Sequence, residues 1–274
     1  MGRPVHSVAF CVNAEKPRAL ARRAELAAVA ERLGLEVRAE GEGEVTVALG
    51  GDGTILRAAR ARPDQPLLGL NLGGLGYLAS VEERDFDSAL EMLARGRYRI
   101  SRRTALAARK LGGGSHSASA LNDIVIMREQ SGHAAVLELE VDGKSATRYM
   151  ADGLVVATPT GSTAYSLSAG GPVLMPDSGV LVVTPMNPHA LGVRPMVVPD
   201  GVRLAVTSRR RVNGRAERIG VYADGETVFS LDGDESMEIV RDGRGVALVE
   251  LEGYDPYDVL ARKLGWSGKG GGSQ

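Results

Sequence analysis

An apolar segment that runs directly into a glycine-rich turn constrains the fold of this chain most. Residues 45–49 have the composition of a buried strand, Gly50-Gly51-Asp52-Gly53-Thr54 follow, and the pattern predicts a helix over residues 55–62. Such a turn lies at the carboxyl end of a strand, where α/β proteins bind ligands. The alternation continues through the first hundred residues and predicts an α/β domain with a parallel sheet and flanking helices. The other predicted strands are residues 5–12, 35–39 and 67–70, and the other helices are residues 17–33 and 85–95.

The sequence pattern changes near Tyr98, after which short apolar segments alternate with turn signals. This pattern predicts a β-rich second domain, and a last helix over residues 256–264 is expected to pack back on the first domain. The predicted parts are residues 1–97, 98–252 and 253–266, and residues 267–274 are interpreted as a flexible tail. The turn signals are Asp142-Gly143, Asp224-Gly225, Asp232-Gly233 and Asp242-Gly243.

Composition excludes several classes of protein. Lys plus Arg (33) nearly cancels Asp plus Glu (34), which argues against a nucleic-acid-binding protein. Cys11 is the only cysteine and the four histidines are scattered, so we expect neither a disulfide nor a metal site built from side chains. The absence of a signal peptide pattern and of an apolar run of about 18–20 residues predicts a cytoplasmic protein with no membrane association.

The turn after residues 45–49 suits phosphate chemistry. Its glycines let the backbone approach a phosphate, and the helix start supplies free N–H groups. Asp52 is repulsive toward phosphate, so it is interpreted as a base, a hydroxyl-binding residue or a metal contact through water. The alternative is a helix cap in an ordinary strand-to-helix turn. The chain lacks the P-loop motif and the Gly-x-Gly-x-x-Gly of dinucleotide-binding dehydrogenases.

Two further segments indicate a nucleotide pocket. Residues 158–168 contain six Ser or Thr hydroxyls and one aromatic ring, Tyr165, on which a base could stack. Asn122-Asp123 precedes a strand and could bind a ribose diol or a carboxamide. The alternatives are an ordinary Ser/Thr-rich loop and an ordinary turn.

Taken in order, these segments resemble the NAD kinase family over nearly the whole chain. The turn at residues 50–54 also occurs in diacylglycerol-kinase-like and phosphofructokinase-like enzymes, whereas residues 158–172 are specific. The matching segments are residues 50–54, 71–78, 120–123, 152–153, 158–172, 188–195, 224–225 and 263–266.

The resemblance implies a two-domain NAD kinase-like fold with the site between the domains. It also implies transfer of the terminal phosphate of ATP, or alternatively of polyphosphate, to the 2′-hydroxyl of the adenosine ribose of NAD. Mg²⁺ would arrive mainly on ATP. The enzyme would be a homodimer or homotetramer, in which a neighbouring subunit supplies some pocket residues.

The resemblance also assigns roles to residues. Asp52 would accept the proton of the hydroxyl, and phosphates would bind at Gly50, Gly51, Gly53 and Thr54. The residues expected to bind NAD are Asp52, Gly53, Arg57, Asn122, Asp123, His133, Asp152, Thr163, Ala164, Tyr165, Ser166, Leu167, Ser168 and Glu226.

Two residues depart from the family pattern. Asp123 stands where most relatives have Glu, and Met150 stands where some have a basic residue, so NADH could be tolerated. The alternative functions are a lipid or sugar kinase and a non-catalytic NAD-binding regulator. The sequence leaves open the phosphate donor, dimer against tetramer, allosteric control and the partner of Asp123.

Overall fold

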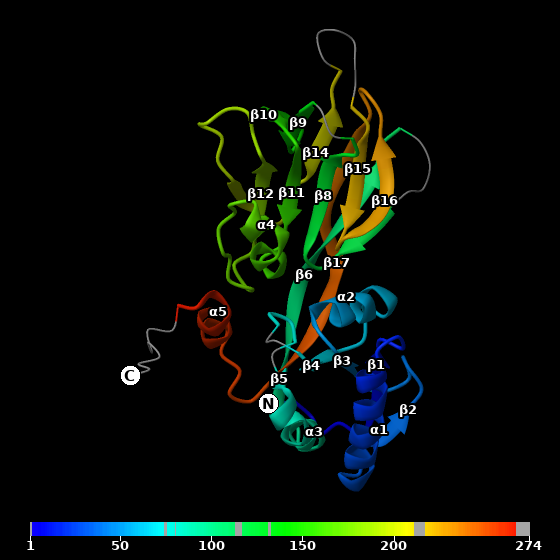
Figure 1. Ribbon diagram of the computed structural model, residues 1–274. Helices are drawn as coiled ribbons and strands as arrows, with labels where there is room; N and C mark the ends of the chain where they lie inside the picture. The colour runs from blue at the N-terminus through cyan, green and yellow to red at the C-terminus, as the bar shows by residue number, and fades with distance from the viewer. Residues whose placement is uncertain are drawn as a thin grey trace. The chain divides into compact units, whose positions relative to one another are not determined.

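The computed structural model describes residues 2–73, 76–79, 81–112, 117–130, 133–210 and 217–266. The chain divides into two compact units, shown in Figure 1. The first comprises residues 1–102 and 246–274, and the second comprises residues 103–245. The boundaries predicted at 97/98 and 252/253 stay predictions, and the predicted tail, residues 267–274, lies outside the described residues.

The first unit is built on parallel strands in the order β2-β1-β3-β4. The short strand β5 and the last part of β17 also pair with β4. The elements are β1 (Ser7–Val12), α1 (Pro17–Arg32), β2 (Glu36–Arg38), β3 (Val45–Leu49), α2 (Asp52–Ala61), β4 (Leu67–Asn71), β5 (Val81–Glu82), a 3₁₀ turn (Glu83–Asp85), α3 (Phe86–Ala94) and α5 (Pro256–Leu264).

Helices cover both faces of these parallel strands. The crossover from β1 to β2 and that from β3 to β4 run in opposite directions, so right-handed connections place α1 and α2 on opposite faces. Figure 1 shows α2 on one face and α1 with α3 on the other. The fully buried Leu26, Leu70 and Leu90 join α1, β4 and α3 in one apolar core. The predicted α/β domain is therefore confirmed.

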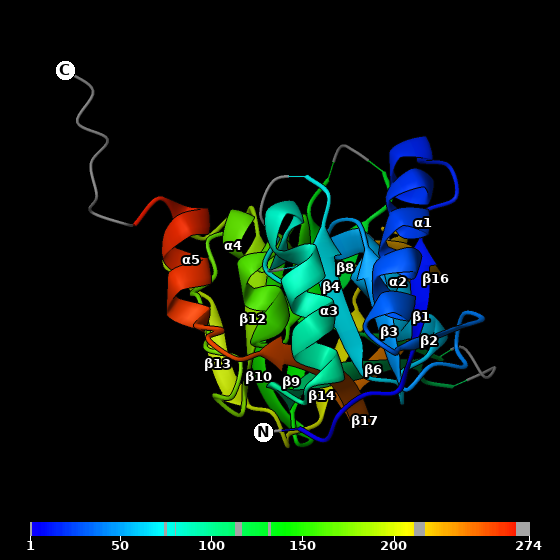
Figure 2. The same ribbon diagram turned by 90° about the horizontal axis from the view of Figure 1, so that it is seen from below.

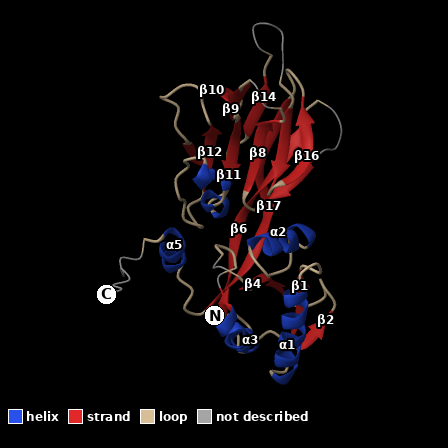
Figure 3. Ribbon diagram, viewed as in Figure 1, coloured by secondary structure: helices blue, strands red, loops and turns tan. Residues whose placement is uncertain are grey.

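The second unit is almost entirely β-structure, as Figure 3 shows, and it confirms the predicted β-rich domain. One sheet has the antiparallel order β13-β12-β11-β8-β15-β16, and its edge strand β13 lies beside β12 in Figure 2. The other contains β10, β9, β14 and the first part of β17, and β6 pairs with β17 and β7. The apolar faces of the two sheets form one core.

The elements that belong wholly or partly to the second unit follow. They are β6 (Tyr98–Lys110), β7 (Ser117–Ala120), β8 (Asp123–Arg128), β9 (Ala135–Val141), β10 (Lys144–Ala151), β11 (Gly153–Ala157), a 3₁₀ turn (Thr160–Thr163), α4 (Tyr165–Ser168), β12 (Val180–Met186), β13 (Met196–Pro199), β14 (Leu204–Ser208), β15 (Ile219–Ala223), β16 (Glu226–Leu231) and β17 (Ser236–Leu251).

The Asp-Gly pairs predict three turns correctly and one wrongly. Asp142-Gly143 and Asp224-Gly225 have positive φ at both residues, as the tight turn of a hairpin requires, and Asp232-Gly233 separates β16 from β17. Asp242-Gly243 instead lies inside the continuous strand β17, so the predicted turn there is wrong. None of the helices among the described residues has the length and apolar composition needed to span a lipid bilayer.

Candidate active site

Asp52 is the first residue of α2, directly after the strand β3 and Gly50-Gly51. The helix thus begins three residues earlier than predicted, because Gly51 already accepts a hydrogen bond from the N–H of Thr54 (2.9 Å). Gly50 has no room for a side chain, since a Cβ would collide with Oγ1 of Thr54. The turn therefore places a carboxylate at a helix start whose first N–H groups have no partner within the helix.

Three consecutive backbone N–H groups hold the half-buried carboxylate of Asp52. Oδ2 accepts from Tyr77 (2.9 Å), and Oδ1 accepts from Leu78 (3.0 Å) and Ala79 (2.9 Å). A Cβ on Gly76 would collide with the carboxylate. A carboxylate has about four acceptor positions, so one remains, and it belongs to Oδ2.

The sequence alone did not predict that residues 77–79 hold the carboxylate of Asp52. The resemblance included residues 71–78 as a matching segment but gave them no task, and Asp52 lies 25 residues before Tyr77. Gly76 was the available signal, because a glycine is required where backbone closely approaches another group. Burial and then the charge of Asp52 raise the pKa of Tyr77.

Arg57 lies one helical turn after Gly53 on α2 and is directed toward the end of β1. Its Nη2 donates to the carbonyl of Val12 (2.7 Å) and lies 3.9 Å from Sγ of the buried Cys11. The connections from β1 and β3 leave in opposite directions, so the carboxyl ends of these strands flank the position where open α/β sheets bind ligands. Arg57 and the turn at residues 50–54 therefore meet at this position.

In the second unit, the Asp224-Gly225 turn holds the segment that contains Asn122 and Asp123. The carboxylate of Asp224 accepts from the N–H groups of residues 121 (2.8 Å), 122 (2.7 Å) and 123 (3.2 Å). Glu226 follows this turn as the first residue of β16. Asp224 was noted in the sequence only as part of a matching pair, and its positioning role was missed.

Asp123 is a buried carboxyl group, 5% exposed. Its carboxylate accepts from the N–H of Tyr165, which starts α4. Burial and, second, the charge of Asp224 raise the pKa of Asp123 to about 7, while the Tyr165 bond acts in the opposite direction. The predicted pair Asn122-Asp123 is thus joined to the predicted segment around Tyr165.

The hydroxyls of residues 158–168 divide into structural and accessible groups. Three fully buried hydroxyls have protein partners: that of Thr158 donates to Leu121, that of Ser162 accepts from Leu174, and that of Ser166 bonds Thr184. The hydroxyl of Ser166 fastens α4 to β12, and the role of Ser166 in NAD binding stays a prediction. The other predicted residues of this segment keep accessible surface: Thr163, Ala164, Tyr165, Leu167 and Ser168.

Asp152 and His133 do not join this group. On β11, Gly153 pairs with Met127 and Ala157 pairs with Asp123, so Asp152 precedes one end of the strand and Asp123 lies at the other. Four residues of strand correspond to about 13 Å. His133 comes two residues before Ala135 of β9, which pairs with Ala151, the residue before Asp152. The NAD-binding residues predicted in the second unit therefore do not form one group within a single chain, since Asp152 lies at one end of β11 and Asp123 at the other.

The group at Asp152 contains two residues that the sequence did not single out. Asp152 accepts from Nε of Arg128 (2.8 Å) and from Nδ2 of Asn187 (2.9 Å). These bonds, with that of Arg128 the stronger, lower the pKa of Asp152. Elsewhere, the described residues contain no group of three or more His, Cys, Asp or Glu side chains arranged to hold a metal ion.

Comparisons with known proteins agree over both units. Residues 12–98 match the family model of the ATP-NAD kinase N-terminal domain, and residues 121–251 match that of the ATP-NAD kinase C-terminal domain. The chain is 39% identical over 229 residues to an NAD kinase of Geotalea daltonii and 42% identical over 228 residues to one of Symbiobacterium thermophilum. Each match covers 82% of this chain and 79% of the relative.

Solved structures share the fold. A yeast NADH kinase complexed with NADH superposes with a TM-score of 0.86 at 24% identity, over 99% of this chain and 90% of that one. An NAD kinase from Archaeoglobus fulgidus in complex with ATP superposes with a TM-score of 0.76 at 25% identity, over 94% of this chain and 97% of that one. The predicted two-domain fold is confirmed, and the chain belongs to the NAD kinase family.

Proposed function

We propose that the chain transfers the terminal phosphate of ATP to the 2′-hydroxyl of the adenosine ribose of NAD, giving NADP and ADP. Membership in the NAD kinase family supports this reaction. The observation that carries the chemistry is the carboxylate of Asp52, held at the start of α2 by three backbone N–H groups. A ribose hydroxyl is a weak nucleophile, and a fixed carboxylate can take its proton as the new bond forms.

Oδ2 of Asp52 is the atom that we assign as the proton acceptor. Oδ1 already accepts from two N–H groups, whereas Oδ2 accepts from one. As the ribose oxygen attacks the terminal phosphorus, its proton moves to Oδ2 and the bond to ADP breaks. Fixing the carboxylate beforehand removes the cost of orienting it during the reaction.

The phosphates are proposed to bind around α2. Gly50, Gly51, Gly53 and Thr54 offer close backbone approach at a helix start, which favours anions. Arg57 adds a positive charge at the end of β1. We propose that ATP arrives as its Mg²⁺ complex, so that the divalent ion enters with the substrate and neutralises charge on the transferred group.

NAD is proposed to bind the accessible residues near Asn122 and Asp123, with Tyr165 for stacking and Glu226 at the rim. Asp224, Thr158 and Ser166 would hold this surface in place through their hydrogen bonds. Ribose hydroxyls can donate to the carboxylate of Asp123 in its ionised form.

The chain is proposed to act as a homodimer or homotetramer. Asp152 lies at the end of β11 opposite to Asp123, and this separation supports placing Asp152, together with His133, in the pocket of a neighbouring subunit. This arrangement would give each complete site residues from two chains. We also propose that the protein acts in the cytoplasm.

The function is tested by incubating the protein with NAD, ATP and Mg²⁺ and following NADP with an NADP-specific dehydrogenase. We expect NADP formation that stops when the divalent ion is chelated. Parallel reactions with NADH or with polyphosphate decide the acceptor and the donor. NAD binding without turnover would favour a regulator, and phosphorylation of diacylglycerol or a sugar instead of NAD would favour the alternative kinases.

A further inference from the structure

The segment that holds Asp52 is itself attached to the helix α5. Residues 77–79 donate to the carboxylate, and Glu82 follows on β5. The ammonium of Lys263 lies 5.5 Å from the centre of the Tyr77 ring, and Nη1 of Arg262 lies 2.8 Å from Oε1 of Glu82. All of these residues belong to the first unit. Two neighbouring cations of α5 thus contact Tyr77 and Glu82.

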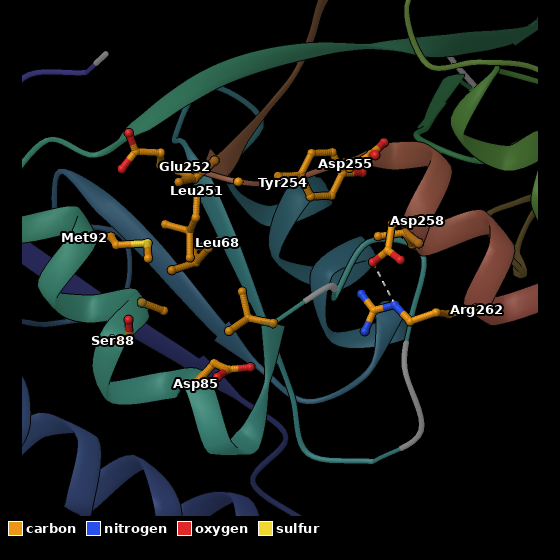
Figure 4. A pocket seen from close by; sticks show the side chains of 15 residues that line it. Leu68, Asp85, Ser88, Met92, Leu251, Glu252, Tyr254, Asp255, Asp258 and Arg262 are labelled. Carbon is orange, nitrogen blue, oxygen red and sulfur yellow. Dashed lines mark ion pairs between the residues drawn. The ribbon is translucent and has the colours of Figure 1, made fainter. Parts of the chain in front are cut away.

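The helix α5 presents these cations from a well-defined last turn. Asp255 caps its start by accepting from the N–H of Tyr257 (2.8 Å), and Gly265 ends it with a φ of 67°. Arg262 is also held by Asp258 one turn earlier (3.0 Å), the ion pair drawn in Figure 4. The side chain of Arg262 is thus oriented before it meets Glu82.

A cavity of about 260 Å³ lies where α5 and the segment before it face α3, and Figure 4 shows its lining. Leu68, Met92, Leu251 and Val259 contribute apolar walls. Of the nine residues of α5, Val259 and Leu260 are buried. The last turn of α5 contacts Tyr77 and Glu82 through Lys263 and Arg262.

We propose that Lys263 and Arg262 are positioning residues that fix the Asp52 carboxylate by holding Tyr77 and Glu82 from α5. Lys263 holds Tyr77, whose N–H binds Oδ2, and Arg262 holds Glu82 beyond Ala79. The proposal rests on the proposed function, because it uses Asp52 as the proton acceptor. Neither cation touches substrate in this scheme, so losing one misplaces the base without removing a binding group.

The test compares Lys263→Met with Lys263→Arg in the NADP assay. We expect Lys263→Met to lower kcat about three- to tenfold with the KM for NAD and for ATP within about twofold of the parent, because a displaced base slows only the chemical step. Lys263→Arg should restore most of kcat, since a guanidinium also binds the face of an aromatic ring. Arg262→Gln should act as Lys263→Met does. Arg95→Met removes an exposed cation at the end of α3 and should leave both parameters unchanged.

The same substitution in an Asp52→Asn background separates the two proposals. If Lys263 acts through Asp52, Lys263→Met should change the residual kcat of Asp52→Asn by less than about twofold. An equal loss in both backgrounds, an unchanged kcat in the parent, or a raised KM in place of a lowered kcat would each overturn the positioning role. If Asp52→Asn alone keeps the parent kcat, the proposed base is wrong instead.

Discussion

The carboxyl group of Asp123 is costly to ionise, because it is 5% exposed and lies beside the carboxylate of Asp224. Its pKa is raised from 3.8 to about 7, so the group changes charge near neutral pH. A protonated Asp123 can donate a hydrogen bond, whereas the ionised form only accepts. If NAD binds here as proposed, its contact with Asp123 should therefore depend on pH.

Stability should depend on pH through the same residue. Because the pKa in the folded protein lies above that of the unfolded chain, the stabilisation is complete below about pH 4 and is lost as the pH rises through 7. Asp123→Asn removes this loss and should raise the free energy of unfolding at pH 8.5 by up to about 4 kcal/mol, with a smaller gain at pH 5.5. Urea unfolding at both pH values measures the difference. An equal effect at the two pH values would contradict the raised pKa.

Asp52 carries the largest expected loss of activity. The amide of Asp52→Asn has nearly the same shape but cannot take the proton, so kcat should fall by about 10²–10⁴. The affinity for NAD should change less, which calorimetric titration measures. Asp87→Asn, on the exposed side of α3, is the matched control and should keep the parent kcat. A parent-like kcat in Asp52→Asn would exclude the base.

At the scale of elements, the sequence predicted those strands and turns whose conformation depends on a few consecutive residues. Strand β3 ending in glycines and the Asp224-Gly225 hairpin were predictable, because a strand pattern and a positive φ at Gly are properties of a few residues. The turn predicted at Asp242-Gly243 was wrong because β17 continues through these residues, and β17 pairs with β6. The two strands approach closely there, since a Cβ on Gly245 would lie 2.7 Å from the carbonyl oxygen of Arg103 on β6.

The candidate site divides in the same way. The place of Asp52 after β3 was predictable because the turn is local, whereas the N–H groups of residues 77–79 come from another loop. The two locations of Asp152 and Asp123 follow from the pairing of β8 with β11, and no short motif contains that register. Pairing between distant segments is therefore the information that a motif lacks.

The Asp224 turn is the element whose loss should affect binding most directly. Asp224→Ala leaves three N–H groups of residues 121–123 without their acceptor, which should lower the free energy of unfolding by about 1–3 kcal/mol. Displacement of Asn122 should raise the KM for NAD about tenfold with less effect on that for ATP. Steady-state kinetics and thermal unfolding measure both. Asp234→Ala, in a separate turn, is the control; a KM for NAD unchanged by Asp224→Ala would remove the role given to this turn.

At the scale of the whole molecule, the proposed sites require two copies of the chain. Asp52→Asn protein and Asp152→Ala protein should each be weakly active alone. After subunit exchange, half of randomly mixed dimers contain both chains and one of their two sites is intact, so about a quarter of the parent activity should return. Native mass spectrometry measures the exchange. Exchanged subunits without recovered activity would show that Asp52 and Asp152 do not serve one site from different chains.

The first unit is discontinuous along the chain, and this has a consequence for synthesis on the ribosome. Residues 1–102 emerge first, but the last part of β17, which pairs with Leu67 of β4, and the helix α5 both come after residue 245. Residues 103–245 are contiguous, so the second unit has its complete sequence while the first still lacks its last strand. Until then β4 lacks its pairing with β17, an exposure that invites association with other chains. The sequence of the second unit is therefore complete on the ribosome before that of the first.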